Sequence, residues 1–475
     1  MGNFKISKFY IYRWRYLIGY GLVAIGLIAA LIFAGMYLPG GISNHEMQSV
    51  IKSSSIKATD FWSINAINLP YYLLQKLSMI VFGVSVLSIK LPSIILAFLS
   101  AIGIVLLLRQ WFRPNIGVLA SLIAITTGQF LFIAQNGTPD VLYLFWSVWI
   151  LLIASLIPIQ EKLRKLFVVA FFMIAALSLY TPLTIYVILV IAGAIILHPH
   201  LRYLIRQLSI SELIIGLIII LIIVSPLILS MVNNPSLGLV LLGIPTEWPN
   251  IGANIASIGS QYFSFFNSSA TTILTPFFEL GSALLIVLGS YFVIKTRSTA
   301  KNYVVILWTL FLIPVIILNP DLTSITFLPL VILLGSGLNG LLSHWYNLFP
   351  RNPYARIGGL IPIIILVTVL VLSGVNRYVY GYRYNPSIVP NFSNDLRLIP
   401  KNTKNIIVSN SELEFYKVLA KYNKRINVST LPTSDTFLAT HNAKRLFNGY
   451  KISQIITTTT YINSDRFYVY KKTTE

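Results

Sequence analysis

The sequence predicts a polytopic α-helical membrane protein with about eleven hydrophobic spans and a small soluble domain after the last one. Of its 475 residues 56% are hydrophobic and only 10% are charged, whereas a soluble domain carries about a quarter charged residues. Long apolar runs with few charges recur along the chain. Because so apolar a chain cannot shield its surface from water, most of it must face lipid.

The apolar runs are close to the length needed to cross about 30 Å of hydrocarbon. They lie near residues 16–38, 86–108, 115–134, 141–158, 165–181, 183–197, 210–232, 274–294, 302–318, 323–343 and 357–375. The fifth and sixth runs are short and meet at Pro182. The first run follows a basic start and is too long for the apolar part of a signal peptide. We therefore assign residues 1–375 to a transmembrane domain.

The loop charges predict the orientation of this domain. With the N-terminus in the cytoplasm, sixteen Lys and Arg residues lie on the cytoplasmic side, and only Lys52, Lys57, Lys76 and Lys90 lie on the other. The sixteen are Lys5, Lys8, Arg13, Arg15, Arg109, Arg113, Lys162, Arg164, Lys165, Arg202, Arg206, Lys295, Arg297, Lys301, Arg351 and Arg356. Since basic loops stay inside, we predict a multi-pass plasma-membrane protein whose N-terminus is cytoplasmic and whose C-terminal domain is extracytoplasmic.

Two predicted outer loops are long. Loop 39–85 begins with a polar stretch and continues with an apolar-basic segment over 73–82, which is typical of helices lying in the membrane interface. Loop 233–273 is rich in Asn, Ser, Gly and aromatic residues. Loops of this length without a functional role are uncommon, so both are candidate parts of a site on the outer face.

Residues 376–475 form the predicted soluble domain, because charged residues become frequent after Gly374. The pattern predicts a small α/β unit. Its expected elements are a strand over 405–409, a helix over 411–422, a strand over 425–429, a second helix over 434–449, and β-rich segments over 452–459 and 466–471. It contains neither a Gly-rich phosphate loop nor a metal-ligand spacing.

Charge and composition exclude several functional classes. The net charge of +21 is spread over loops and the last hundred residues, which indicates topology-setting charge and no nucleic-acid partner. The chain has no Cys, so disulfides, thiolate metal sites and Cys nucleophiles are excluded. A transporter or flippase is disfavoured, since we find no internal repeat and almost no charge at mid-span. The partner that composition does require is the lipid bilayer.

A series of motifs between residues 40 and 185 resembles one class of membrane enzyme. In chain order they are Asn44-His45-Glu46, Asn68-Leu69-Pro70-Tyr71-Tyr72, the segment 77–83, Lys90-Leu91-Pro92-Ser93, Thr138-Pro139-Asp140 and Tyr180-Thr181-Pro182. Their order and spacing resemble the GT-C superfamily of glycosyltransferases. Within it, they are similar to the glycosyltransferase family 39-like enzymes, which include protein O-mannosyltransferases and lipid A aminoarabinose transferases.

The resemblance implies an inverting glycosyltransferase that moves a sugar from a polyprenyl-phosphate carrier to an acceptor on the outer face of the membrane. Such transfer needs a base for the acceptor proton and positive charge or a metal for the leaving phosphate. We expect Glu46, helped by His45, to take the proton and Asp140 to orient the acceptor or a divalent cation. The remaining substrate-binding candidates are Asp60, Lys52, Lys57, Tyr71, Tyr72, Gln135 and Tyr180.

The motifs also depart from the family pattern. His45 stands where the family has its leading Asp, and Gln135 and Asn136 occupy the region of an Arg that accompanies the second Asp. Ser324 and Thr326 stand where a late span of the family carries another Arg. These departures leave an alternative open, in which the chain is a catalytically inactive GT-C-like scaffold or a cell-envelope binding protein.

Overall fold

The computed structural model describes residues 41–56, 66–267, 269–270, 273–296, 299–348, 358, 360–385, 388, 392, 395–423, 426–432, 434–457 and 465–473. The predicted first span, 16–38, lies outside these residues, and so do Lys57 and Asp60.

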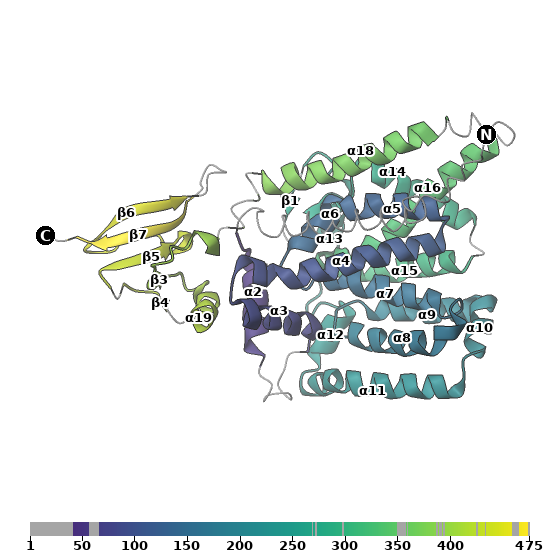
Figure 1. The fold of residues 1–475 in the computed structure, drawn as a ribbon, viewed down its shortest axis with the longest axis horizontal. Helices are drawn as coiled ribbons and strands as arrows, with labels where there is room; N and C mark the ends of the chain where they lie inside the picture. The colour runs from purple at the N-terminus through teal and green to yellow at the C-terminus, as the bar shows by residue number, and fades with distance from the viewer. Residues whose placement is uncertain are drawn as a thin grey trace, which may run out of the picture.

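The apolar helices run side by side in one bundle, and a β-sheet lies at one end of it, here called the sheet end (Figure 1). The bundle helices are α4 (Val86–Trp111), α5 (Pro114–Thr126), α6 (Gly128–Gln135), α7 (Val141–Leu156), α8 (Arg164–Ser178), α9 (Ile185–Leu197), α11 (Ile210–Asn233), α14 (Leu280–Lys295), α15 (Ala300–Leu318), α16 (Phe327–Leu348) and α18 (Leu360–Tyr378). Their positions follow the apolar runs of the sequence, so the prediction of a helical membrane protein is confirmed.

Five helices in the described part of the chain are long and apolar enough to cross a membrane, and eight are if each sharply bent pair forms one span. The five are Val86–Trp111, Ile210–Asn233, Ala300–Leu318, Pro320–Leu348 and Ile361–Tyr382. The bent pairs are α5 with α6 at 59°, α7 with 161–178 at 115°, and α9 with α10 (Pro199–Arg206) at 99°. The total of about eleven spans stays a prediction.

The break between α5 and α6 has a local cause. The Thr127 hydroxyl donates a hydrogen bond to Ala124 O at 2.7 Å and accepts one from Phe130 N at 3.3 Å. Thr127 thus ends one helix and caps the next. At this point α18 comes very close, because a Cβ on Gly374 would lie 2.4 Å from Thr126 O. The bend directs α6 toward the turn 136–140 at the sheet end.

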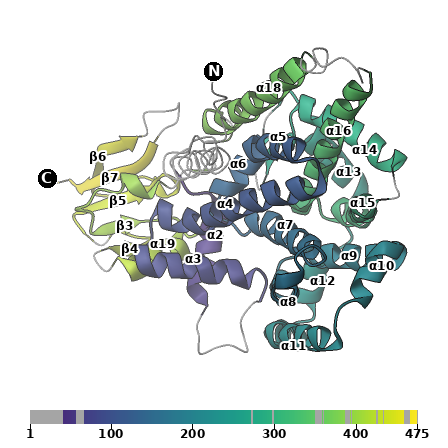
Figure 2. The same cartoon turned by 45° about the vertical axis from the view of Figure 1, so that its right-hand side comes forward.

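Short helices fill both long loops. In the first loop, α3 (Leu69–Phe82) covers the segment 73–82 that was predicted to be helical, and α2 (Asn44–Ser55) precedes it. Both views place these helices at the sheet end of the bundle (Figures 1 and 2). The second loop contains α12 (Ser236–Leu242), α13 (Ile251–Phe263) and a two-residue strand, β1 (Ser269–Ala270).

The predicted span 274–294 begins later than the sequence suggested. Leu274–Thr275 forms β2, which pairs antiparallel with β1, and α14 starts only at Leu280. Pro276 follows directly, and because proline has no N–H and restricts the residue before it, a helix is disfavoured here.

Helices α14 and α16 pack in close contact through glycines. A Cβ on Gly289 would lie 1.8 Å from Leu333 O, and one on Gly337 would lie 2.1 Å from Leu285 O. Small residues at such positions let two backbones approach, which is how helices commonly associate in membranes.

The C-terminal sheet has the strand order β4-β3-β5-β7-β6. The strands are β3 (Asn405–Ile407), β4 (Asn427–Ser429), β5 (Thr436–Thr440), β6 (Tyr450–Thr457) and β7 (Asp465–Lys472). Strand β3 is parallel to β4 and β5, and β7 is antiparallel to β5 and β6. Helix α19 (Leu413–Tyr422) connects β3 to β4. The expected strands and first helix are confirmed.

The predicted second helix over 434–449 is wrong. Residues 436–440, Thr-Phe-Leu-Ala-Thr, form the central strand β5, and the short 3₁₀ turn His441–Ala443 follows it. Phe437, Leu438 and Ala439 are all buried, so this strand packs on both faces of the sheet. A continuous apolar run of this kind does not distinguish a buried strand from a helix by periodicity.

The C-terminal sheet shares a hydrophobic core with the first outer loop. Helix α19 packs against α2, and buried apolar side chains of both belong to one cluster with the start of α4. Its members include Met47, Val50, Met79, Val86, Ile89, Ile406, Phe415, Tyr416, Leu419 and Phe467. The sheet therefore supports α2, the helix that carries the first predicted site motif.

Candidate functional site

The site is built on the first turn of α2. Ser43 Oγ accepts a hydrogen bond from Glu46 N at 3.2 Å, and Glu46 Oε2 accepts one from Ser43 N at 2.8 Å. This reciprocal pair is a capping box, which satisfies two backbone donors at the start of the helix. It also fixes the Glu46 side chain, whose exposed fraction is 0%.

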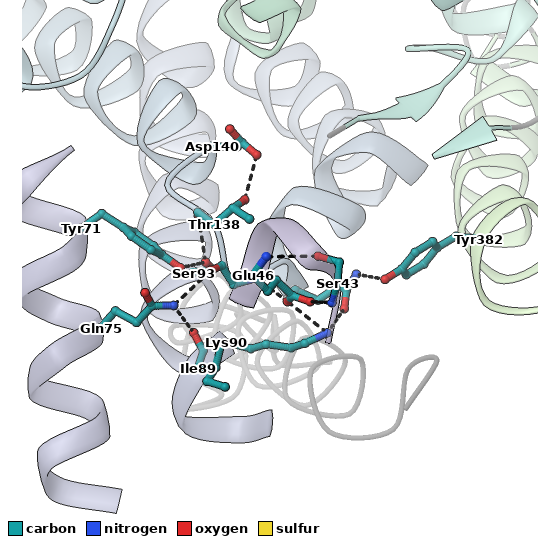
Figure 3. Close-up of polar contacts among 12 residues, drawn as sticks. Ser43, Glu46, Tyr71, Gln75, Ile89, Lys90, Ser93, Thr138, Asp140 and Tyr382 are labelled. Carbon is teal, nitrogen blue, oxygen red and sulfur yellow. Dashed lines mark hydrogen bonds and ion pairs between the residues drawn. The ribbon is translucent and has the colours of Figure 1, made fainter. Parts of the chain in front are cut away.

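Glu46 connects the two motif segments that the sequence singled out. Its Oε1 accepts a hydrogen bond from Gly137 N at 2.7 Å and lies 3.4 Å from Lys90 Nζ. Neither member of the Glu46–Lys90 ion pair is exposed. Figure 3 shows these contacts joining α2, α4 and the turn after α6. Two segments about ninety residues apart in sequence are thus held in direct contact.

Two hydrogen bonds lead from the ion pair to Tyr382, just after the last bundle helix, α18. Lys90 Nζ donates to Gln135 Oε1 at 3.2 Å, and Gln135 Nε2 donates to the Tyr382 hydroxyl at 2.8 Å. Gln135 and Tyr382 are both fully buried. Burying charge is costly unless it is paired and hydrogen-bonded, and this chain of contacts supplies both.

A second buried amide, Gln75 of α3, holds the same segments together. Gln75 Nε2 donates to Ile89 O and to Gly137 O, each at 3.1 Å. Gln75 Oε1 accepts hydrogen bonds from the Ser49 and Ser53 hydroxyls of α2 at 2.8 and 2.5 Å. All four hydrogen-bonding positions of the amide are used, so α2, α3, α4 and the turn 136–140 form one rigid unit.

Asp140 lies at the rim of this unit. Thr138 Oγ1 donates to Asp140 Oδ2 at 2.8 Å, and the Thr138 carbonyl accepts from Ser93 Oγ at 3.4 Å. Ser93 Oγ in turn lies 2.8 Å from the Tyr71 hydroxyl. Asp140 is only partly buried, and its Oδ1 accepts no hydrogen bond from the residues that the structure describes.

The electrostatic surroundings distinguish the two carboxylates. Burial raises the pKa of Asp140 above its usual value, while the Thr138 hydrogen bond and the charge of His45 oppose the rise. Burial, together with the charge of Asp140, raises the pKa of Tyr72 to about 12, so Tyr72 keeps its proton at neutral pH. Glu46 instead has the ammonium group of Lys90 beside it.

The structure places the other predicted residues as follows. His45 and Lys52 are exposed on α2, and His45 is close enough to Asp140 to act on its charge. Tyr72 is buried, and the negative charge of Asp140 is close enough to act on its hydroxyl group. The Tyr180 side chain belongs to a separate apolar cluster, where its hydroxyl donates to Ile223 O at 2.7 Å, although its carbonyl accepts a hydrogen bond from Asn68 N at 2.7 Å. The structure thus gathers Glu46, His45, Asp140, Tyr71, Tyr72 and Gln135, whereas the side chain of Tyr180 lies outside this group.

Sequence reasoning missed several residues of this network, among them Lys90, Gln75 and Tyr382. For Lys90 a signal was present, because an ionisable residue inside an apolar run is costly and has a partner as a rule. Gln75 and Tyr382 gave no such signal, since their partners lie on segments distant in sequence.

A further charge at the end of α18, that of the partly buried Arg377, was also missed. Its Nε and Nη2 are buried and have no hydrogen-bond partner among the described residues. Glu279 is the carboxylate that acts on it. Burial raises the pKa of Glu279, and the charge of Arg377 lowers it.

Within the described residues no group of three or more His, Asp or Glu side chains comes together as a metal site. The cation beside Glu46 among these residues is Lys90, whose Nζ lies 3.4 Å from Glu46 Oε1. A divalent cation held by Asp140 stays a prediction, as one of the two roles that the sequence allowed for that residue. Asp60, a further predicted carboxylate, lies outside the described residues.

A family comparison covers the segment that carries most of these motifs. Residues 69–229 match the dolichyl-phosphate-mannose-protein mannosyltransferase family. None of the curated proteins matches the sequence significantly.

Several solved structures share the fold of the chain. ArnT from Cupriavidus metallidurans in the apo state has 12% identity and a TM-score of 0.50, over 96% of this chain and 98% of that one. The same protein bound to undecaprenyl phosphate has 11% identity and a TM-score of 0.50, over 95% and 98%. The Archaeoglobus fulgidus oligosaccharyltransferase tethered with an acceptor peptide has 10% identity and a TM-score of 0.51, over 85% and 63%.

At these identities the similarity establishes the fold. The predicted resemblance to GT-C glycosyltransferases is confirmed by the family match and by the fold.

Proposed function

We propose that this protein is a membrane glycosyltransferase that moves a sugar from a polyprenyl-phosphate carrier to an acceptor on the outer face of the plasma membrane. The observation that carries the proposal is the 2.7 Å hydrogen bond between Gly137 N and Glu46 Oε1, because it joins both acidic motifs in one unit at one end of the bundle. The ArnT structure bound to undecaprenyl phosphate has the same fold and supports this class of donor.

The proposed reaction is an inverting displacement. The acceptor hydroxyl oxygen attacks the anomeric carbon of the sugar, the bond from that carbon to the phosphate oxygen breaks, and the polyprenyl phosphate leaves with the electron pair. The acceptor proton goes to a carboxylate. A carboxylate of moderately raised pKa is a suitable base near neutral pH.

Glu46, His45 and Asp140 form the proposed catalytic set, and the geometry favours a division of roles among them. Asp140 has an oxygen without a hydrogen-bond partner among the described residues and a raised pKa, so we assign to it the acceptor proton. Both oxygens of Glu46 accept backbone hydrogen bonds, and Lys90 faces one of them. Glu46 then positions the turn 136–140, and its earlier assignment as the base becomes the alternative.

Lys52 and Lys57 are the proposed cations for the departing phosphate. Lys52 lies exposed in the last turn of α2, where its flexible stem can reach a phosphate at the bilayer surface. The Tyr72 hydroxyl stays protonated at neutral pH and is a proposed hydrogen-bond donor to the sugar or the acceptor. Asp60, Tyr71, Gln135 and Tyr180 remain proposed contributors to substrate binding.

The test is a transfer assay with the full chain reconstituted in liposomes. The donors are radiolabelled polyprenyl-phosphate hexoses and pentoses, and the acceptors are extracted envelope glycans, lipids and proteins. Asp140→Asn should reduce turnover at least about a hundredfold, since a catalytic base contributes about 10²–10⁴-fold. Asp321→Asn is the matched control, because Asp321 is an exposed carboxylate outside the network, and this variant should stay within about twofold.

The alternative assignments predict different outcomes. If Glu46→Gln loses turnover as a folded protein while Asp140→Asn keeps it, the base is Glu46. If both variants transfer normally, the site lies elsewhere. If the unmodified protein transfers from none of the donors, the inactive scaffold is the correct interpretation.

A further inference from the structure

A pocket of about 250 Å³ lies at the end of the bundle opposite the sheet, where α4, α14 and α16 end and α15 begins. Helix α4 starts beside the candidate site and ends at this pocket, and its 26 residues span roughly 39 Å at 1.5 Å per residue. The pocket is therefore separate from the site around Glu46. Neither the family match nor the proposed reaction assigns it a role.

One wall of the pocket is a polar stripe on α16. Ser336, Asn339, Ser343 and Asn347 line it at intervals of three and four residues, which place them on one face of the helix. The structure gives the side chains of Asn339, Ser343 and Asn347 no hydrogen bond among the described residues. Asn339 and Ser343 are partly buried and Asn347 is exposed, so their amide and hydroxyl groups are available to a polar ligand that enters the cavity.

The charge of the lining indicates the sign of that ligand. Lys301 is the cation, with Nζ 4.2 Å from the centre of the Phe112 ring and donating to Trp111 O at 3.1 Å. An ammonium group has three donors, so two stay available among the described contacts. The other titratable residue of the lining is His344, and no Asp or Glu belongs to it.

We propose that this pocket binds a phosphate-bearing anion of about the size of a lipid head group. Amide and hydroxyl donors with one ammonium group suit a phosphate, and basic pockets between membrane helices on the cytoplasmic side bind anionic head groups. The volume is slightly below that of a typical small-molecule site. Apolar lining from Phe112, Phe292 and Val293 suits the first carbons of the acyl chains of a lipid.

The experiment measures binding to the full chain in detergent by native mass spectrometry after delipidation. Three probes are added separately: dioleoyl phosphatidylglycerol, dioleoyl phosphatidylcholine and inorganic phosphate. Lys301→Met removes the charge and keeps the stem. Lys295→Met is the matched control, because Lys295 lies at the same end of the bundle, exposed and outside the lining.

Phosphatidylglycerol should bind, and Lys301→Met should weaken its binding at least about tenfold while Lys295→Met changes it less than twofold. Asn339→Leu, which keeps the charge, should weaken it as well. Binding of inorganic phosphate with the same variant pattern, but of neither lipid, would support the site and assign it to a soluble phosphate. Equal losses in both lysine variants, equal binding of phosphatidylcholine, or no binding of any probe would overturn the proposal.

Discussion

Glu46 and Lys90 face each other at 3.4 Å with no exposed surface on either side chain. Glu46 lies in the first turn of α2, and Lys90 lies in the first turns of α4. A buried charge is costly without its partner. The ion pair therefore couples the position of α2 to that of the bundle.

Lys90→Met should therefore destabilise the protein strongly. It leaves Glu46 buried without its partner, which costs about 3–5 kcal/mol in comparable pairs. The measurement is the melting temperature in detergent, followed by tryptophan fluorescence. The double variant Lys90→Met with Glu46→Gln should recover part of the loss, because no unpaired charge remains. Equal melting temperatures for Lys90→Met and the unmodified protein would contradict the buried pair.

Transfer activity should depend on the protonation of Asp140. A base acts in its deprotonated form, so kcat/KM should fall as the pH falls through the pKa of Asp140. Since burial raises that pKa, the fall should be centred above the ordinary aspartate value of about 3.9. The residual activity of Asp140→Asn should lack this acidic limb, whereas Asp321→Asn should keep it. An unchanged limb in Asp140→Asn would assign the proton to another group.

The contact between α14 and α16 should tolerate no side chain at its closest points. Gly337→Ala places a Cβ 2.1 Å from Leu285 O, and forced overpacking of this kind costs about 1–3 kcal/mol. The melting temperature should drop clearly. Gly259→Ala on α13 is the control, because a Cβ there meets nothing within 4 Å, and it should be neutral or stabilising. Similar behaviour of the two variants would argue against the close contact.

Loss of the shared core should affect the site from a distance. Phe415 is 1% exposed in the cluster that includes Met47 and Val50 of α2, and Phe→Ala in a core costs about 3–5 kcal/mol. Phe415→Ala should loosen α2 and lower transfer, which limited proteolysis and the liposome assay would measure together. Leu446→Ala, at a fully exposed leucine, should change neither. If Phe415→Ala were more sensitive to protease but transferred sugar normally, the site would not depend on packing against the sheet.

The predicted orientation can be tested with reporters. Fusions after Arg297 and after Asn402 should report opposite sides of the membrane, because the first position belongs to the basic loops and the second to the C-terminal domain. An alkaline phosphatase and a fluorescent reporter at each position provide the measurement. Both positions on one side would refute the predicted topology.

The helical part of the fold was predictable because apolar length alone indicates a membrane helix. The same rule failed at Leu274, where two strand residues and Pro276 extend an apolar run without being helical. It also failed in the sheet, where Phe437 to Ala439 are buried on both faces and so lack the alternation that marks a strand.

The candidate site was predictable only in part. The order of motifs placed Glu46 and Asp140 in one region, and the structure joins them through Gly137 and Thr138. The partners that hold them, Gln75 and Tyr382, could not be found in the same way. Their hydrogen bonds cross 62 and 247 positions of sequence, and no local pattern records such contacts.

The shared core also sets an order of events during synthesis. Ile406, Phe415 and Phe467 complete the cluster on which α2 rests, and the ribosome makes them hundreds of residues after α2 itself. A chain whose synthesis stopped before β7 would already contain every bundle helix and every hydrogen-bonding partner of Glu46. Its α2 would still lack part of its packing, so maturation of the site would wait for the last strand to emerge.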